Sequence, residues 1–358
     1  MNPTLLTVIR KHAGMYPLSQ PCDAVKLIYQ SVFGPGHMIP SEEAAQEWLE
    51  AEYNTVPKDG EARIESLGKT ARVYMNTHLS KEKRQLLARL FCESAKAFCK
   101  GWDTADEGTK EEFTKALICL RNVTEEGIFG FTTTELDAYL AEYRTAGYPA
   151  VRHSEIYRKA YAPAYRVIDS RFARIFDLLA DIGERLKNGK RLVVAVDGRC
   201  ASGKTTVAER ISSIFPASVI HMDDFFLPGE YRTPERMAET GGNLHRERFL
   251  EEVIPNLRGG SFTHRVFQCS TFTYADAPHV VEDNALLICE GSYALHPDFG
   301  TYYDMAVFSD IEPKEQLRRI RVRNGEFLLK RFQNEWIPME EKYFTEMQIR
   351  EKCGYLLV

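Results

Sequence analysis

The chain has 358 residues, of which 44% are hydrophobic and 27% are charged, and these values exclude a disordered or fibrous protein. The formal net charge is −5 without a long block of like charge, so nucleic acid is not an expected partner. The 8 cysteines form no C-x-x-C pair, and there is neither a transmembrane-length apolar stretch nor a secretory signal, so we expect a cytoplasmic protein without a membrane partner.

A length of 358 residues favours two domains, and the first is expected over residues 1–162. This part reads mainly as helices separated by Gly, Pro and Asp residues, and no characterised family is recognised in it. The clearest helical patterns cover Ser41–Tyr53, Lys81–Lys100 and Glu135–Arg144. We therefore predict a mainly helical amino-terminal domain, whose role the sequence does not indicate.

Two segments of this domain carry polar or aromatic residues in a pattern. FGPGHMIP, at residues 33–40, fails the dinucleotide fingerprint because Ile39 stands where the third glycine belongs, and its Gly-Pro content favours a tight turn. HSEIYRKAYAPAYRVI places His153, Tyr157 and Tyr161 four residues apart on an expected helix before Pro163. Such an aromatic stripe either packs against a neighbouring domain or takes part in an acceptor pocket, and both interpretations stay open.

A linker helix and an α/β domain are expected over residues 163–358. Apolar residues follow a 3.6-residue period between Pro163 and Lys187, which predicts a long amphipathic helix. Beyond it, short apolar strands alternate with helical stretches, at Leu192–Val196, Ser218–His221, Ala285–Cys289 and Met305–Phe308. The alternation predicts a doubly wound, mostly parallel sheet with helices on both faces.

The segment VDGRCASGKTT carries a phosphate-binding pattern between a strand and a helix. Gly198 is followed by four residues and then by Gly203, Lys204 and Thr205, which is the spacing of a P-loop. Glycines let backbone amides curl around a phosphate, and the following helix directs its positive end toward the same oxygens. The alternative, a glycine-rich turn, leaves the adjacent lysine and threonines unexplained. The expected nucleotide-binding residues are Gly198, Ala201, Ser202, Gly203, Lys204, Thr205 and Thr206.

Two further strand ends carry carboxylates. Asp223 and Asp224 follow one apolar strand, and Glu290 ends another, beside Gly291. Ligands collect at the carboxyl ends of parallel strands, so these residues are expected to converge with the P-loop. A carboxylate of this aspartate pair could accept the proton of an attacking hydroxyl and help to hold Mg²⁺, for which Thr205 and Glu290 are further predicted ligands. The alternative is that the aspartates cap the next segment and Glu290 is a solvated turn residue.

An arginine-rich stretch, EPKEQLRRIRVRNGEFLLKRF, follows the last predicted strand. Phosphoryl transfer requires mobile cations that neutralise the moving charge, and Arg319 and Arg323 are the predicted catalytic arginines. Arginines on a helix also commonly form a solvated face, which is the competing interpretation. The Asn324-Gly325 pair predicts a turn within this stretch.

Taken together, VDGRCASGKTT, HMDDFFLP, GGNLHRERF and LICEGSYALHP resemble the uridine kinase-like group of P-loop kinases over about residues 190–358. The resemblance implies that Lys204 and Thr205 serve the triphosphate and magnesium. It also implies that Asp223 is the catalytic base and a metal partner, and that Glu290 completes the magnesium environment. It also implies that Phe226 takes the place of a tyrosine that meets the nucleoside. The acceptor-binding stretch departs from the group, since it offers Asn243, His245 and Arg246 instead of a carboxylate, and Gln268 replaces a second one.

These departures put uridine itself in doubt and favour an acceptor that carries negative charge, because Arg246 and His245 are cationic or polar. Interior packing of His245 is an equally good interpretation. We therefore expect a kinase that uses ATP and Mg²⁺ to phosphorylate an alcohol group of a small molecule. The competing hypothesis is a nucleotide-dependent regulatory switch, which needs no base at Asp223.

Overall fold

The computed structural model describes residues 3–35, 39, 41–58, 60 and 63–358. The chain forms two compact units, Met1–Ala180 and Asp181–Val358. The division falls inside the predicted linker segment rather than at its start. Among the described residues, every helix is too short or too polar to span a bilayer.

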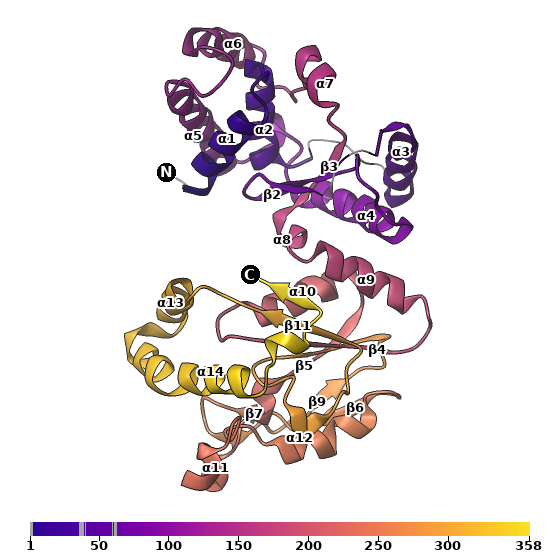
Figure 1. Ribbon diagram of the computed structural model, residues 1–358, viewed down its shortest axis with the longest axis vertical. Coiled ribbons are helices and arrows are strands. Elements are labelled where there is room, and N and C mark those ends of the chain that lie inside the picture. The colour runs from indigo at the N-terminus through magenta and orange to yellow at the C-terminus, as the bar shows by residue number, and fades with distance from the viewer. Residues whose placement is uncertain (1–2, 36–38, 40, 59, 61–62) are drawn as a thin grey trace. The chain divides into compact units, whose positions relative to one another are not determined.

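The amino-terminal unit is mainly helical and contains one small antiparallel sheet (Figure 1). Its first seven helices are α1 Pro3–Met15, α2 Pro21–Phe33, α3 Glu42–Thr55, α4 Lys81–Ala97, α5 Glu107–Thr124, α6 Thr133–Thr145 and α7 Glu155–Tyr161. Ile9, Leu27, Phe113 and Leu136 join α1, α2, α5 and α6 in one buried cluster. The three helices predicted from the sequence correspond to α3, α4 and α6.

The prediction of one long helix over Pro163–Lys187 is wrong. Tyr165–Asp169 forms strand β3, which pairs antiparallel with β2 (Thr70–Tyr74), and β2 pairs with β1 (Ile64–Ser66). Helix α8 (Ser170–Ala173) follows, and only α9 (Phe176–Leu186) retains the predicted helical pattern. The apolar period gave the wrong prediction because the strand is short. Its pairing partner lies about 95 residues earlier, so no local pattern reveals the pairing.

The aromatic stripe packs inside its own unit. Helix α7 begins after the N-cap Ser154, so His153 precedes the helix instead of lying on it. Tyr157 is fully buried, stacks on His153 with a centroid separation of 4.2 Å, and also contacts Tyr16, which directly follows α1. In the segment expected to form a tight turn, Gly34 and Pro35 adopt a turn, and residues 36–38 and 40 lie outside the described residues.

The carboxyl-terminal unit is built on a five-stranded parallel sheet in the order β12-β11-β4-β10-β5. The strands are β4 Leu192–Gly198, β5 Ala217–His221, β10 Leu286–Glu290, β11 Met305–Ser309 and β12 Tyr355–Leu357. The first four were predicted, and β12 was missed. Short antiparallel pairs join β6 (Phe262–His264) to β9 (His279–Val281) and β7 (Phe267–Gln268) to β8 (Thr273–Tyr274).

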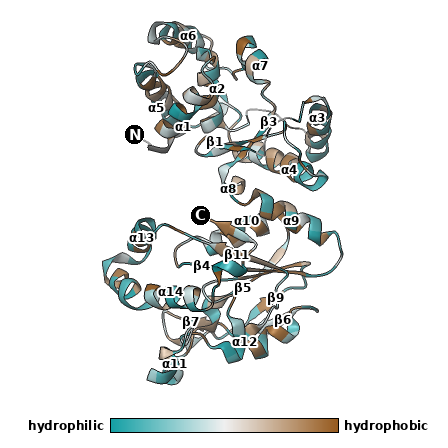
Figure 2. Ribbon diagram, viewed as in Figure 1, coloured by the Kyte–Doolittle hydropathy of each residue, from teal (hydrophilic) through white to brown (hydrophobic). Residues whose placement is uncertain are grey.

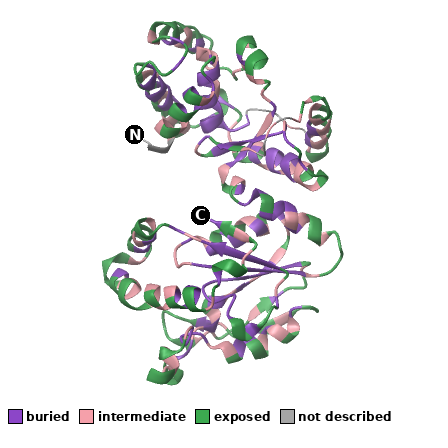
Figure 3. Cartoon of the chain, in the orientation of Figure 1, coloured by how far each residue is buried: buried purple, intermediate pink, exposed green. Residues whose placement is uncertain are grey.

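Helices cover both faces of this sheet, as a doubly wound fold requires (Figure 1). The helices are α10 Lys204–Ile214, α11 Pro234–Ala238, α12 Arg246–Glu252, α13 Pro313–Arg331 and α14 Ile337–Glu346. Phe249 of α12 and Tyr343 of α14 share a buried cluster with Val193 and Leu287 of the sheet. Figure 2 shows these strands as largely hydrophobic, and Figure 3 shows them buried, whereas α13 is mostly hydrophilic and exposed.

Candidate active site

Strand register brings the predicted site residues to one edge of the sheet. Gly198 of β4 pairs with Ser309 of β11, and Glu290 of β10 pairs with Val196 on one side and with His221 on the other. Strands β10 and β11 lie on opposite sides of β4, so the connections that leave β4 and β10 run to opposite sides of the sheet, which makes the end of β4 a topological switch point. The loop after β4 therefore occupies the position where ligands bind in parallel α/β sheets.

The loop between β4 and α10 has the backbone conformation that its glycines permit. Gly198 has a φ of 136°, and a Cβ atom there would lie 2.0 Å from the carbonyl oxygen of Ser309. Gly203 has a φ of 100° and stands at the N-cap of α10. Ala201 also has a positive φ, of 59°, which is uncommon for a residue with a Cβ atom. The loop thus carries strain at a position where function would justify it.

The side chain of Lys204 lies back against this loop. Its Nζ atom donates hydrogen bonds to the carbonyl oxygens of Gly198 at 2.7 Å and Arg199 at 2.9 Å, and to the Ser292 hydroxyl at 3.3 Å. The residue is only 9% exposed. Phosphate oxygens are stronger acceptors for an ammonium group than these neutral oxygens, so Lys204 is in place to exchange partners when a phosphate enters.

Thr205 and Glu290 supply oxygen atoms beside the loop. The Thr205 hydroxyl donates to Oε1 of Glu290 at 3.0 Å, and the same oxygen contacts Nδ1 of His221 at 2.6 Å. The hydrogen bond to Glu290 raises the pKa of His221, with burial acting in the opposite direction. A hydroxyl and carboxylates are hard ligands of the kind that Mg²⁺ takes together with phosphate oxygens. The described residues hold no group of three His, Cys, Asp or Glu side chains arranged for a metal.

Asp223 and Asp224 lie in a 3-10 turn, Met222–Phe225, directly after β5. Side chains in such a turn are about 120° apart, so the two carboxylates do not point to opposite faces as adjacent residues of a strand do. Solvent reaches Asp223, yet enough protein surrounds its carboxylate that desolvation raises the pKa, while the charge of Lys204 lowers it and that of Glu290 raises it. Asp223 is thus within electrostatic reach of both the P-loop lysine and Glu290.

Asp224 has a second, different environment. Its carboxylate lies 3.8 Å from Nε2 of His264, a fully buried ring. Desolvation, together with the neighbouring Asp223 charge, raises the pKa of Asp224 to about 6, against lowering by His221 and Arg248. Both aspartates therefore lie near the sheet edge, and the contact with His264 is particular to Asp224.

An ion pair that the sequence did not reveal holds this turn. Arg248, which is 2% exposed, donates to the carbonyl oxygen of Asp224 at 3.0 Å and pairs with Glu252 at 3.0 Å on the same helix. Glu252 also accepts hydrogen bonds from the backbone and side chain of Arg265. The four-residue spacing of Arg248 and Glu252 was a visible signal, although many such pairs are merely solvated.

Asp197, the residue before Gly198, is a second residue beside the P-loop that sequence reasoning did not identify. It is fully buried and accepts hydrogen bonds from the backbone N–H groups of Gly198, Tyr293 and Leu295, and from the Tyr343 hydroxyl at 2.8 Å. Desolvation raises its pKa to about 6 despite these donors. Asp197 thereby fixes the start of the P-loop to the turn after Glu290 and to α14. Nothing in a single sequence distinguishes it from a solvated turn aspartate.

The arginine-rich stretch forms α13, and both predicted arginines lie near the site. Arg319 donates to the carbonyl oxygen of Ala201 at 3.3 Å and pairs with Glu315 at 2.9 Å. Arg323 donates to Asn324, and its charge lowers the pKa of Asp223. The predicted turn is a break in the helix at Gly325, where φ is 76° and ψ is 172°.

The predicted acceptor residues lie beyond the aspartate turn. Phe226 bridges to Leu244, and the backbone of His245 donates to Phe225, so these residues form one short connected layer. Asn243 is 8% exposed, and its Oδ1 atom is buried without a hydrogen-bond partner, as is Nδ1 of His245. Such orphaned polar atoms are uncommon and mark a place for a polar ligand or water.

Arg246 differs from its neighbours because its charge is already paired. It contacts Glu239, and its Nε atom lies 3.3 Å from Oδ2 of Asp298. Two carboxylates therefore compete with any anionic acceptor for this guanidinium. Gln268, at the end of β7, is exposed and accepts from Thr271.

Comparison with known proteins gives matches among solved structures alone, because no family model and no curated protein matches the chain. A protein from Bacillus stearothermophilus, assigned provisionally as a uridine kinase, is 20% identical with a TM-score of 0.42, over 52% of this chain and 98% of that one. A protein from a Silicibacter species, assigned provisionally as a fructose transport system kinase, is 18% identical with a TM-score of 0.42, over 50% and 97%. D-glycerate 3-kinase from Cryptococcus neoformans is 13% identical with a TM-score of 0.34, over 48% and 86%.

Proposed function

We propose that this chain is a kinase that uses ATP and Mg²⁺ to phosphorylate an alcohol hydroxyl of a small molecule. The observation that carries the proposal is the meeting of Lys204, Thr205 and Glu290 at one sheet edge, with Asp223 in electrostatic reach. A phosphate-binding loop alone would serve a switch as well. The carboxylate of Asp223 beside it provides the additional group that transfer to a hydroxyl needs.

Each residue has a distinct part in the transfer. The backbone amides of the P-loop and the ammonium of Lys204 would hold the phosphates, while Thr205, Glu290 and Asp223 would hold Mg²⁺. The metal, when bound, neutralises charge on the phosphate oxygens. Asp223 accepts the proton of the acceptor hydroxyl. The acceptor oxygen bonds to the γ-phosphorus as the bond from this phosphorus to the ADP oxygen breaks. Arg319 and Arg323 would stabilise the charge of the transferred group.

The acceptor is proposed to bind along the layer formed by Phe226, Asn243 and His245. The orphaned Oδ1 of Asn243 and Nδ1 of His245 are suited to hydroxyl groups. Since Arg246 is paired with Glu239 and Asp298, we propose a neutral, hydroxyl-rich acceptor in preference to an anionic one. This revises the preference for an anionic acceptor that the sequence suggested.

The test is an ADP-release screen over nucleosides, sugars, polyols, pantothenate-like compounds and hydroxy acids, each with ATP and Mg²⁺. At least one acceptor class should stimulate ADP release by the wild type, and the Lys204→Ala variant should lose that stimulation while it stays folded. ATP binding without stimulation by any acceptor class would favour the regulatory switch instead.

A further inference from the structure

The amino-terminal unit contains a cavity of about 540 Å³, a volume typical of small-molecule sites. Its walls come from α2, α3, α4, α7 and β3, all within residues 1–180. Cationic and aromatic side chains dominate the lining, and those that matter here are Lys26, Trp48, Arg152, Arg158 and Arg166. Nothing in the kinase proposal uses this cavity.

The charges around the cavity do not balance. Lys26, Arg152, Arg158 and Arg166 face one lining carboxylate, Glu52, which is bonded to Arg166 at 2.7 Å. Desolvation, together with the charges of Arg72, Arg158 and Arg152, lowers the pKa of Lys26 to about 8, although the charge of Asp23 opposes this shift. An ammonium group surrounded by like charges in this way is stabilised when an anion approaches.

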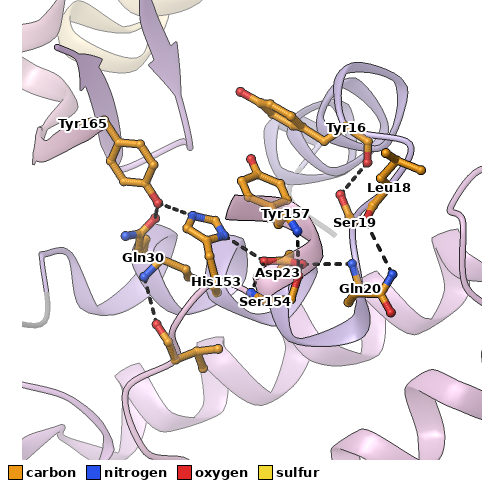
Figure 4. Close-up of polar contacts among 12 residues, drawn as sticks. Tyr16, Leu18, Ser19, Gln20, Asp23, Gln30, His153, Ser154, Tyr157 and Tyr165 are labelled. Atoms are coloured by element: carbon orange, nitrogen blue, oxygen red, sulfur yellow. Dashed lines mark hydrogen bonds and ion pairs between the residues drawn. The ribbon is translucent and has the colours of Figure 1, made fainter. Parts of the chain in front are cut away.

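The wall behind these cations is fixed by buried hydrogen bonds (Figure 4). His153 contacts Oδ1 of Asp23 at 2.8 Å through Nδ1 and the Tyr165 hydroxyl at 2.7 Å through Nε2. Desolvation lowers the pKa of His153 to about 4, so the neutral ring donates to Asp23 and accepts from Tyr165. Asp23 also accepts from the backbone and hydroxyl of Ser154.

This network leaves the cavity with cationic donors. The Asp23 carboxylate and the His153 ring already bind one another, whereas the guanidinium groups of Arg152 and Arg158 belong to exposed residues that can reorient. Trp48, which is 46% exposed, and the buried ring of Phe91 add aromatic surface to the same cavity. A fixed wall whose one carboxylate is already held by His153 and Ser154, movable arginines and aromatic faces suit an anion that has an apolar or planar part.

We propose that this cavity binds a phosphate group, either as free phosphate or as the ester of a small metabolite. Phosphate is favoured over a single carboxylate because it carries up to two negative charges and offers three oxygens to several cations at once. Guanidinium groups recognise such oxygens in pairs, and Lys26 adds a point charge. The site lies within the amino-terminal unit and does not depend on the kinase assignment.

The test uses the full-length chain with Lys204→Ala in every sample, which weakens phosphate capture at the P-loop. Inorganic phosphate, phenyl phosphate and phenol are titrated by calorimetry. Arg158→Gln and Arg152→Gln should each weaken phosphate-probe binding by about tenfold or more, because each removes a charge-assisted hydrogen bond. Lys159→Gln is the matched control, since Lys159 is an exposed neighbour on α7 that does not line the cavity.

The two phosphate probes separate the sources of the ligand. Similar affinities for inorganic phosphate and phenyl phosphate would indicate that the phosphate group alone is recognised. Tighter binding of phenyl phosphate would indicate that the ligand is an ester whose organic part packs against Trp48. Phenol should not bind measurably. The proposal is overturned if neither phosphate probe gives saturable binding, or if both arginine variants bind as tightly as Lys159→Gln.

Discussion

The hydroxyl of Thr205 donates a 3.0 Å hydrogen bond to Oε1 of Glu290, which connects the first turn of α10 to the end of β10. This pair tests the proposed metal site. Thr205→Val keeps the size of the side chain and removes the oxygen, so the Mg²⁺ concentration for half-maximal turnover should rise, with turnover falling about tenfold or more. Thr205→Ser retains the hydroxyl and should behave nearly as the wild type. Equal Mg²⁺ dependence in Thr205→Val and Thr205→Ser would contradict the assignment.

The assignment of the base distinguishes Asp223 from Asp224. Asp223 senses the charges of Lys204, Glu290 and Arg323, whereas Asp224 lies 3.8 Å from the buried His264. A positioned base contributes about a hundredfold to ten-thousandfold, so Asp223→Asn should reduce turnover by that order and Asp224→Asn by much less. Steady-state rates and nucleotide affinity of both variants provide the measurement. A larger loss in Asp224→Asn would reverse the roles, and lost nucleotide binding in Asp223→Asn would indicate a mainly metal-holding residue.

The Arg248–Glu252 pair should contribute to stability and to its pH dependence. Burial alone would raise the pKa of Glu252, but hydrogen bonds from Arg248 and Arg265 outweigh it and lower the pKa to about 2. A depressed carboxyl pKa stabilises the folded state above the unfolded value near 4.5, and this stabilisation is lost as the pH falls toward 2. After allowance for screening by solvent at this partly open site, we expect the pair to contribute about 2 kcal/mol to the free energy of unfolding.

Urea unfolding of Glu252→Gln measures this contribution. The variant should be less stable than the wild type at pH 7, because the buried Arg248 loses its partner, and the difference should shrink as the pH falls below about 4.5. Glu251→Gln, at an exposed neighbouring position, is the control and should change little. A difference that stays constant from pH 7 to pH 3 would show that the pair does not titrate in this way.

The sequence predicted the carboxyl-terminal unit well because its signals are local. The P-loop spacing between a strand and a helix places Lys204 and Thr205 without reference to distant residues. Glu290 ends one apolar strand, and Asp223 lies two residues after the end of another. Parallel pairing then requires those ends to meet, as Glu290 and His221 do. The fold of this unit and the meeting of the predicted residues at one sheet edge follow from short patterns combined with one rule of sheet topology.

What the sequence could not predict depends on contacts between distant residues. Strand β3 exists because Tyr165–Asp169 pairs with β2, and its Ile168 also fitted the helical period of the residues that follow. Asp197 holds Tyr343 from 146 positions away, and a single sequence carries no record of that hydrogen bond. The same holds for His153, whose partner Asp23 is 130 positions distant.

Gly325 provides the last prediction because it lies between two parts of the chain that are both hydrogen-bonded to the P-loop. Gln316 of α13 donates to the carbonyl oxygen of Cys200, and Glu340 of α14 accepts from the N–H of the same residue. The P-loop thus holds both sides of the break. With a φ of 76° and a ψ of 172°, Gly325 has a conformation open essentially to glycine alone.

Gly325→Ala should therefore strain the backbone. No atom lies within 4 Å of the added Cβ, so the cost comes from the φ and ψ angles and not from a clash. We expect a stability loss of about 1–3 kcal/mol. If the strain is relieved by moving Arg323 away from Asp223, turnover should fall roughly tenfold with little change in ATP affinity, because the arginine acts on the transferred group. Thermal unfolding, steady-state rates and nucleotide binding are the measurements. Gly14→Ala, in α1 with no positive φ and open space at Cβ, is the matched control and should not lower stability or turnover. A Gly325→Ala enzyme as stable and as active as this control would show that the break does not position Arg323.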